Sequence, residues 1–112
     1  MVNWSEALGA VQGDKALLQE LSEIFLAEYP ALLTEARTAL ERGDAAGLQH
    51  ACHTLRGSVR QFCAKTVEEG CSHLETVAGA HGLGEANGPV ATLECELGRL
   101  AETLRSFLAD RT

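Results

Sequence analysis

Apolar residues recur every three or four positions along most of this chain, the spacing that places side chains on one face of an α-helix. The pattern predicts a short N-terminal helix within residues 4–11 and a long helix that ends near Arg42, with Asp14 as its N-cap. Pro30 interrupts the long run, so it predicts either a kinked helix or two helices that meet near Tyr29.

Three more helices are predicted after the long one. Gly43 and Asp44 end the long helix and cap the next, which runs over about residues 45–62. A fourth helix carries apolar residues between positions 67 and 78, and the glycine-rich stretch "AHGLGEANGP" (80–89) predicts a loop. Pro89 suits the first position of the last helix. We therefore predict an all-α fold, an antiparallel four-helix bundle with a short additional N-terminal helix.

The length of 112 residues indicates a single domain, 1–112. A net charge of −7 argues against binding to nucleic acid or to an anionic membrane surface. No apolar run is long enough to span a membrane, and the N-terminus does not resemble a signal peptide, so we expect a cytoplasmic protein. The four cysteines form no C-x-x-C pair, which favours reduced, buried residues over a zinc or redox site.

His53 lies on the solvent face of the third predicted helix. At about 100° per residue, the apolar residues of that helix fall on the side opposite His53. The positions within about 60° of it are polar, basic or glycine. These positions are Gln49, His50, Arg56, Gly57 and Arg60. Because residues 45–67 contain no Asp or Glu, the sequence predicts a basic strip centred on His53 in an otherwise acidic chain.

Gly57 lies one turn after His53, where a mid-helix glycine costs about 1 kcal/mol relative to alanine. It is either a tolerated surface glycine or a gap that lets another protein's backbone approach the imidazole.

Several chemistries of an exposed histidine are unsupported here. No H-E-x-x-H, E-x-x-H or C-x-x-C-H pattern surrounds it, so we expect neither a metal nor a haem site. A general base needs an orienting acid and a pocket, and the local sequence offers neither. Nucleophilic chemistry remains, because a neutral imidazole nitrogen can accept a phosphoryl group whose charge Arg56 and Arg60 would balance. A partner would then have to supply the rest of the active site.

The segment "CHTLRGSVRQFCA" resembles the H-x-L-K-G-S-x-x-x-F-G-A segment of histidine-containing phosphotransfer (HPt) domains of bacterial phosphorelays. The preceding "GDKALLQELSEIFLAEYPALLTEARTALERGD" and the following "SHLETVA" are similar to the neighbouring helices of that family, so the resemblance covers residues 3–110. Two positions differ from the family pattern: Arg56 stands in place of the usual lysine, and Cys63 in place of a glycine.

The resemblance implies a phosphotransfer carrier rather than an enzyme, with no ATP-binding module of its own. His53 would be phosphorylated on its outward Nε2, Arg56 would assist the phosphate, and Gly57 would give access to the partner. Gln49, His50 and Arg60 would join Gly57 in contacting that partner. The implied partners are a response-regulator receiver domain, which would supply Mg²⁺, and a hybrid sensor histidine kinase, of which this chain could be a part.

We expect the chain to act as a monomer that needs no cofactor of its own. The family also suggests a further polar residue on the following helix, for which Glu68, Glu69 and Ser72 are candidates. Two other functions stay open: an adaptor bundle that carries no phosphate, and a histidine-kinase dimerisation domain. The second usually has an acidic residue directly after the histidine, where Thr54 stands here.

Overall fold

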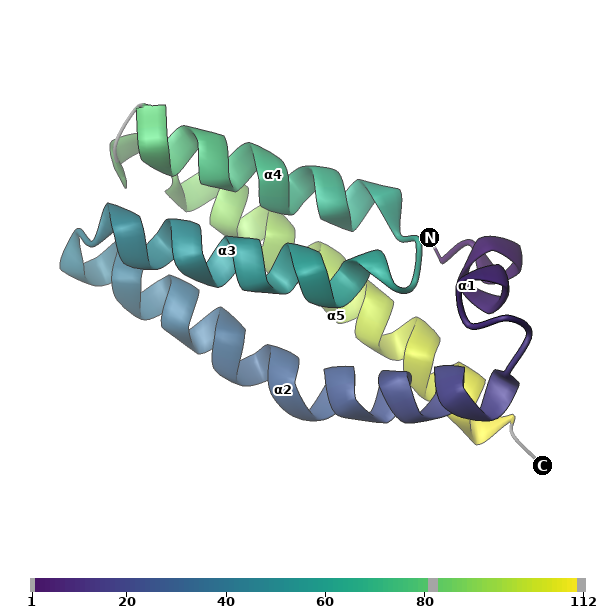
Figure 1. Cartoon of the computed structure of the whole chain (residues 1–112). Helices are drawn as coiled ribbons and strands as arrows, with labels where there is room; N and C mark the ends of the chain where they lie inside the picture. The colour runs from purple at the N-terminus through teal and green to yellow at the C-terminus, as the bar shows by residue number, and fades with distance from the viewer. Residues whose placement is uncertain (1, 81–82, 111–112) are drawn as a thin grey trace.

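The computed structural model describes residues 2–80 and 83–110, and these residues are almost entirely helical. Four long helices lie alongside one another, and the short helix α1 lies at one end of them (Figure 1). The helices are α1 (Trp4–Ala10), α2 (Lys15–Arg42), α3 (Ala45–Arg60), α4 (Lys65–Ala80) and α5 (Asn87–Ala109), with a short 3₁₀ helix, η1 (Leu83–Glu85). The predicted all-α bundle with an additional N-terminal helix is confirmed.

Helix α2 is continuous through Pro30, so the alternative of two helices meeting near Tyr29 is wrong. The helix changes direction about midway along its length (Figure 1), as expected where a proline ring replaces a backbone donor. Its ends agree with the sequence. The Asp14 side chain accepts a hydrogen bond from the Leu17 amide at 3.0 Å, and Gly43 closes the helix with φ of 72°.

Helix α3 ends at Arg60, two residues before the predicted end at 62. The chain then turns through Cys63, whose φ of 52° lies in the left-handed region that favours glycine. This geometry explains why the family pattern has a glycine at this position. Phe62 remains fully buried within the turn, where its ring meets the ring of Phe25 edge-on at 5.6 Å.

Helix α5 begins at Asn87, so Pro89 is its third residue rather than its first. Proline is still acceptable there, because the amides of the first helical turn have no carbonyl partner within the helix. The predicted loop 80–89 includes a 3₁₀ turn at Leu83–Glu85. His81, which has no motif around it in the sequence, lies outside the described residues.

One apolar core fills the space between the four long helices. The residues that the helical spacing assigns to the buried side of the third helix are all at most 1% exposed. They are Leu48, Ala51, Cys52, Leu55, Val59 and Phe62. Leucines of α4 and α5 complete the centre, and Trp4 of α1 packs against Phe107 near the end of α5, with ring centroids 4.6 Å apart. None of the described helices is both long and apolar enough to cross a membrane.

Candidate functional site

His53 lies on the outer surface of α3, as the helical spacing predicts. Its side chain is 66% exposed, whereas the core residues of the same helix are buried. Gly57 lies one turn further along, and a Cβ atom built there would meet nothing within 4 Å. The space beside the imidazole is therefore open, as the access hypothesis requires.

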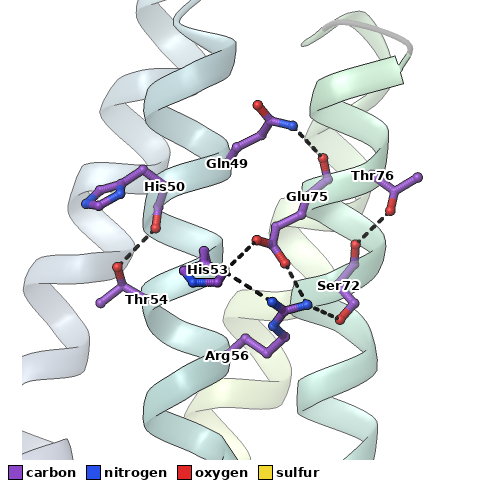
Figure 2. Close-up of polar contacts among 8 residues, drawn as sticks. All are labelled: Gln49, His50, His53, Thr54, Arg56, Ser72, Glu75 and Thr76. Carbon is purple, nitrogen blue, oxygen red and sulfur yellow. Dashed lines mark hydrogen bonds and ion pairs between the residues drawn. The ribbon is translucent and has the colours of Figure 1, made fainter.

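A row of residues, polar apart from Gly79, joins α3 to α4 beside the core, and we call it the α3–α4 ladder. Its α3 members are Gln49, His53, Arg56 and Arg60. Its α4 members, in the opposite chain direction, are Gly79, Glu75, Ser72 and Glu68. Both sets repeat at helical spacings of three and four residues, so each forms a stripe along its helix. His53 occupies one of the two inner positions (Figure 2).

At the centre of the ladder, the Glu75 carboxylate lies between His53 and Arg56 (Figure 2). Glu75 Oε1 is 3.2 Å from His53 Nδ1, and Oε2 is 3.2 Å from Arg56 Nη1. The same Nη1 donates to Ser72 Oγ at 3.2 Å, while Arg56 Nη2 lies 3.1 Å from His53 Nδ1. At 20% exposure, the Glu75 side chain is far more enclosed than the imidazole that it contacts.

The two neighbours of His53 Nδ1, Glu75 and Arg56, require opposite protonation states of this nitrogen. A carboxylate only accepts hydrogen bonds, so Glu75 requires a protonated Nδ1. A guanidinium only donates, so Arg56 requires a free lone pair on Nδ1. Arg56 already has acceptors in Ser72 and in the second oxygen of Glu75. Every polar contact that the structure gives the imidazole is thus made through Nδ1, on the side of α4.

The outer positions of the ladder are also occupied. Arg60 Nε lies 3.6 Å from Glu68 Oε1. At the other end, Gln49 points toward α4 (Figure 2) and its Nε2 donates to the backbone oxygen of Glu75 at 3.2 Å. A Cβ atom at Gly79 would lie 2.4 Å from that same Nε2, so the Gln49 amide occupies the space that a larger residue would fill.

The predicted basic strip is corrected by these contacts. Residues 45–67 contain no acid, but α4 brings Glu68 to Arg60 and Glu75 to Arg56. Each arginine of the strip therefore has a carboxylate beside it, and the surface around His53 is nearly balanced in charge.

Glu75 is the central residue that the sequence analysis missed. Of the three candidates on this helix, Ser72 does contact Arg56, Glu68 pairs with Arg60 at the end of the ladder, and Glu69 is exposed. Every ladder residue of α4 directly follows a buried apolar residue in sequence, and Glu75 follows Leu74. A helical projection of α4 like the one made for α3 would have placed Glu75 beside its core stripe.

The structure separates the two neighbouring histidines. His50 points away from α4 (Figure 2) and lines an open hollow between α2 and α3 with Glu35 and Arg42. His53 faces α4 instead. Only His53 is thus part of the α3–α4 ladder, while His50 is an exposed side chain on the adjoining surface.

All four cysteines are free thiols. Cys52 and Cys71 are buried as predicted, whereas Cys63 is half-buried and Cys95 is exposed, so the prediction of burial is wrong for these two. Burial, with a smaller contribution from the Glu75 charge, raises the pKa of Cys52 to about 12, and burial likewise raises that of Cys71 to about 12. Such thiols are poor nucleophiles and metal ligands at neutral pH. Among residues 2–80 and 83–110, no group of three or more His, Cys, Asp or Glu side chains could hold a metal ion.

Comparisons with known proteins identify the fold and the family. The fold is similar to that of a solved structure, the HPT domain from a sensor hybrid histidine kinase of Shewanella, with a TM-score of 0.87 and 20% sequence identity. That alignment covers 99% of this chain and 96% of the other. A search of curated proteins returns no match. The sequence itself matches the Hpt domain over residues 20–108, so the chain belongs to the Hpt family, the phosphotransfer domains of phosphorelays.

Proposed function

We propose that this chain carries a phosphoryl group on Nε2 of His53, between the aspartates of response-regulator receiver domains. The observation that supports it is the arrangement of the imidazole, which is 66% exposed and contacts Glu75 through Nδ1. If Glu75 accepts a hydrogen bond from Nδ1–H, the lone pair of a neutral imidazole is on Nε2. The nucleophilic nitrogen is then the one that faces away from the ladder.

Transfer needs no proton to move within this chain. The Nε2 lone pair attacks the phosphorus of an aspartyl phosphate, a P–N bond forms, and the P–O bond to the aspartate breaks. The aspartate leaves as a carboxylate, and the ring keeps its Nδ1 proton and gains positive charge. The Glu75 carboxylate, 3.2 Å from Nδ1, stabilises that charge. In the reverse step the ring leaves as a neutral imidazole with its Nδ1 proton in place.

Arg56 has two roles in this proposal. In the unphosphorylated state it bridges Ser72 and Glu75, which holds both the guanidinium and the carboxylate in place. Once the phosphoryl group is bound, its oxygens compete for the guanidinium, a planar donor suited to phosphate. Arg56 thus has the role that the family resemblance implies for it, which is to assist the phosphate on His53.

The receiver domain completes the active site. In this proposal it contributes the acidic pocket, the Mg²⁺ ion and the acceptor aspartate, while this chain contributes the histidine and brings no ATP-binding module. Gly57 leaves open space one turn from His53, where the receiver backbone would approach. Gln49, His50 and Arg60 lie on α3 within two turns of His53, and the proposed contact with the partner extends to them.

The test is incubation of the chain with a phosphorylated receiver domain and Mg²⁺. The expected product is an acid-labile, base-stable phosphate on the wild type and on His73→Gln, and none on His53→Gln. His73 is the matched control because it is an exposed histidine of α4 that lies outside the proposed contact. A wild type that binds the receiver and stays unlabelled would instead be an adaptor. Label transferred from a kinase's ATP, together with an obligate dimer, would identify a kinase dimerisation domain.

A further inference from the structure

Glu75 is held at both its side chain and its backbone. Its carboxylate contacts His53 and Arg56, and its backbone oxygen accepts a hydrogen bond from Gln49 Nε2 at 3.2 Å. We propose that Gln49 and Gly79 are positioning residues for the phosphotransfer reaction, which set the place of Glu75 and hence the protonated nitrogen of His53. This inference rests on the proposed function of His53.

The two contacts that fix Glu75 come from adjacent turns of α3. Gln49 and His53 are four residues apart, so their side chains lie one above the other on the same helix face. One of them binds the backbone of Glu75 and the other its carboxylate. Together they fix how far α4 is shifted along α3, and a slip between the helices would move the carboxylate away from Nδ1.

Gly79 makes room for this contact. Its backbone is helical, so the glycine is not required by conformation, and within a helix it is less favourable than alanine. A methyl group at this position would lie 2.4 Å from Gln49 Nε2. Because the amide is the end of a flexible side chain, it would move aside and lose its hydrogen bond to Glu75. The glycine thus preserves a contact at the expense of helix stability.

Gln49 was predicted to contact a partner, and its geometry supports the additional role proposed here. The residue is only partly exposed, and its amide nitrogen is already bonded to α4. A side chain used solely for docking would not need a glycine opposite it on the neighbouring helix.

The experiment compares Gly79→Ala with Gly98→Ala. Gly98 is a matched control, since it lies within α5 and an added Cβ would meet nothing within 4 Å. Two-dimensional ¹H–¹⁵N spectra of the imidazole report the tautomer of His53, and phosphoramidate, a small phosphoryl donor, reports its reactivity without any partner. Thermal unfolding of each variant is measured in parallel.

For Gly79→Ala we expect a thermal midpoint at or above that of the wild type, a larger population of the Nε2–H tautomer, and phosphorylation slower by roughly two- to tenfold, the effect of one lost hydrogen bond. Gly98→Ala should keep the wild-type tautomer and rate. Wild-type spectra and rates in Gly79→Ala would overturn the proposal. The proposal would also be overturned if Gly79→Ala were phosphorylated more slowly only because its thermal midpoint was lower.

A second variant keeps the test decisive. Gln49→Met retains the length of the side chain but has no donor, so it should reproduce the tautomer shift of Gly79→Ala. The double variant should be no slower than either single one, because both remove the same hydrogen bond. Additive effects would contradict the proposal. Failure of the proposed function itself would show separately, as a wild type that phosphoramidate and phosphorylated receivers do not label.

Discussion

Nδ1 of His53 lies 3.2 Å from Oε1 of Glu75, so a carboxylate from α4 orients the imidazole of α3. Glu75→Gln keeps an oxygen at this position and removes its charge. We expect phosphorylation of His53 to slow by roughly fivefold, since hydrogen bonds to charged groups are worth about 1 kcal/mol more than neutral ones. Single-turnover labelling from a phosphorylated receiver measures this. Glu69→Gln, an exposed residue of the same helix, is the control, and equal rates in the two variants would contradict the role of Glu75.

A substitution at Gly57 tests whether this residue affects the access of a partner or the reactivity of the imidazole. Gly57→Gln places a long side chain in open space, so the fold should be retained and the helix slightly strengthened. Transfer from a receiver domain should slow by roughly tenfold, the effect of a steric cost near 1.4 kcal/mol. Labelling by phosphoramidate should be nearly unchanged, because this donor needs little space. Equal slowing with both donors would show that Gly57 affects the imidazole itself.

Arg56 tests the importance of a planar cation beside the phosphate. Arg56→Ala removes the contacts to Ser72 and Glu75, so we expect slower labelling and a shorter lifetime of the phosphohistidine, without complete loss. Arg56→Lys should be intermediate, since it keeps the charge but cannot bridge two acceptors with one planar group. The measurements are the labelling rate and the decay of isolated phosphoprotein. Wild-type behaviour of the alanine variant would show that the charge is dispensable.

Cys63 has a left-handed backbone conformation that glycine adopts more easily. Cys63→Gly should therefore raise stability by about 1 kcal/mol, or roughly 4–8 °C in Tm. Urea unfolding and calorimetry measure this. Cys63→Ala shortens the side chain without relieving the backbone, so it should give no such gain. A similar gain in both variants would assign the effect to the thiol instead.

Because two of its thiols are buried, we expect the folded protein to lose stability at high pH. Burial raises the pKa of Cys52 and Cys71 from 9.0 to about 12, so the folded state keeps protons that the unfolded state releases above pH 9. Their contribution to the free energy of unfolding is complete below pH 9. Between pH 9 and 12 it declines by about 1.4 kcal/mol per pH unit for each thiol. Urea unfolding at several pH values measures the slope. Cys52→Ala should make it shallower, and a substitution at the exposed Cys95, Cys95→Ser, should not.

Much of the fold and the exposure of His53 could be predicted from sequence, because both depend on periodicity within one helix. The buried stripe of α3 follows from helical spacing, and it leaves His53 on the opposite face. The caps Asp14 and Gly43 are equally local signals. Pro30 could not be decided in this way, because tolerance of a proline depends on the packing around the whole helix.

The ladder could not be predicted, because it depends on the register between two helices. The absence of acids in residues 45–67 indicated a basic surface, and only the packing of α4 shows that Glu68 and Glu75 balance it. The backbone conformation of Cys63 could not be predicted from the sequence either. Its replacement of the family's glycine was visible in the sequence, but the positive φ that explains the preference appears only in the folded turn.

The balanced charge of the α3–α4 ladder affects how fast a partner is found and how strongly salt changes that rate. Strong opposite charges accelerate encounter and make it sensitive to salt. Here the arginines beside His53 already have carboxylates next to them, so an acidic receiver gains little long-range attraction. Association should then proceed at the ordinary rate of about 10⁵–10⁷ M⁻¹s⁻¹ and depend weakly on ionic strength. In the proposed carrier role, the choice among successive partners would then depend on short-range contacts rather than on long-range attraction.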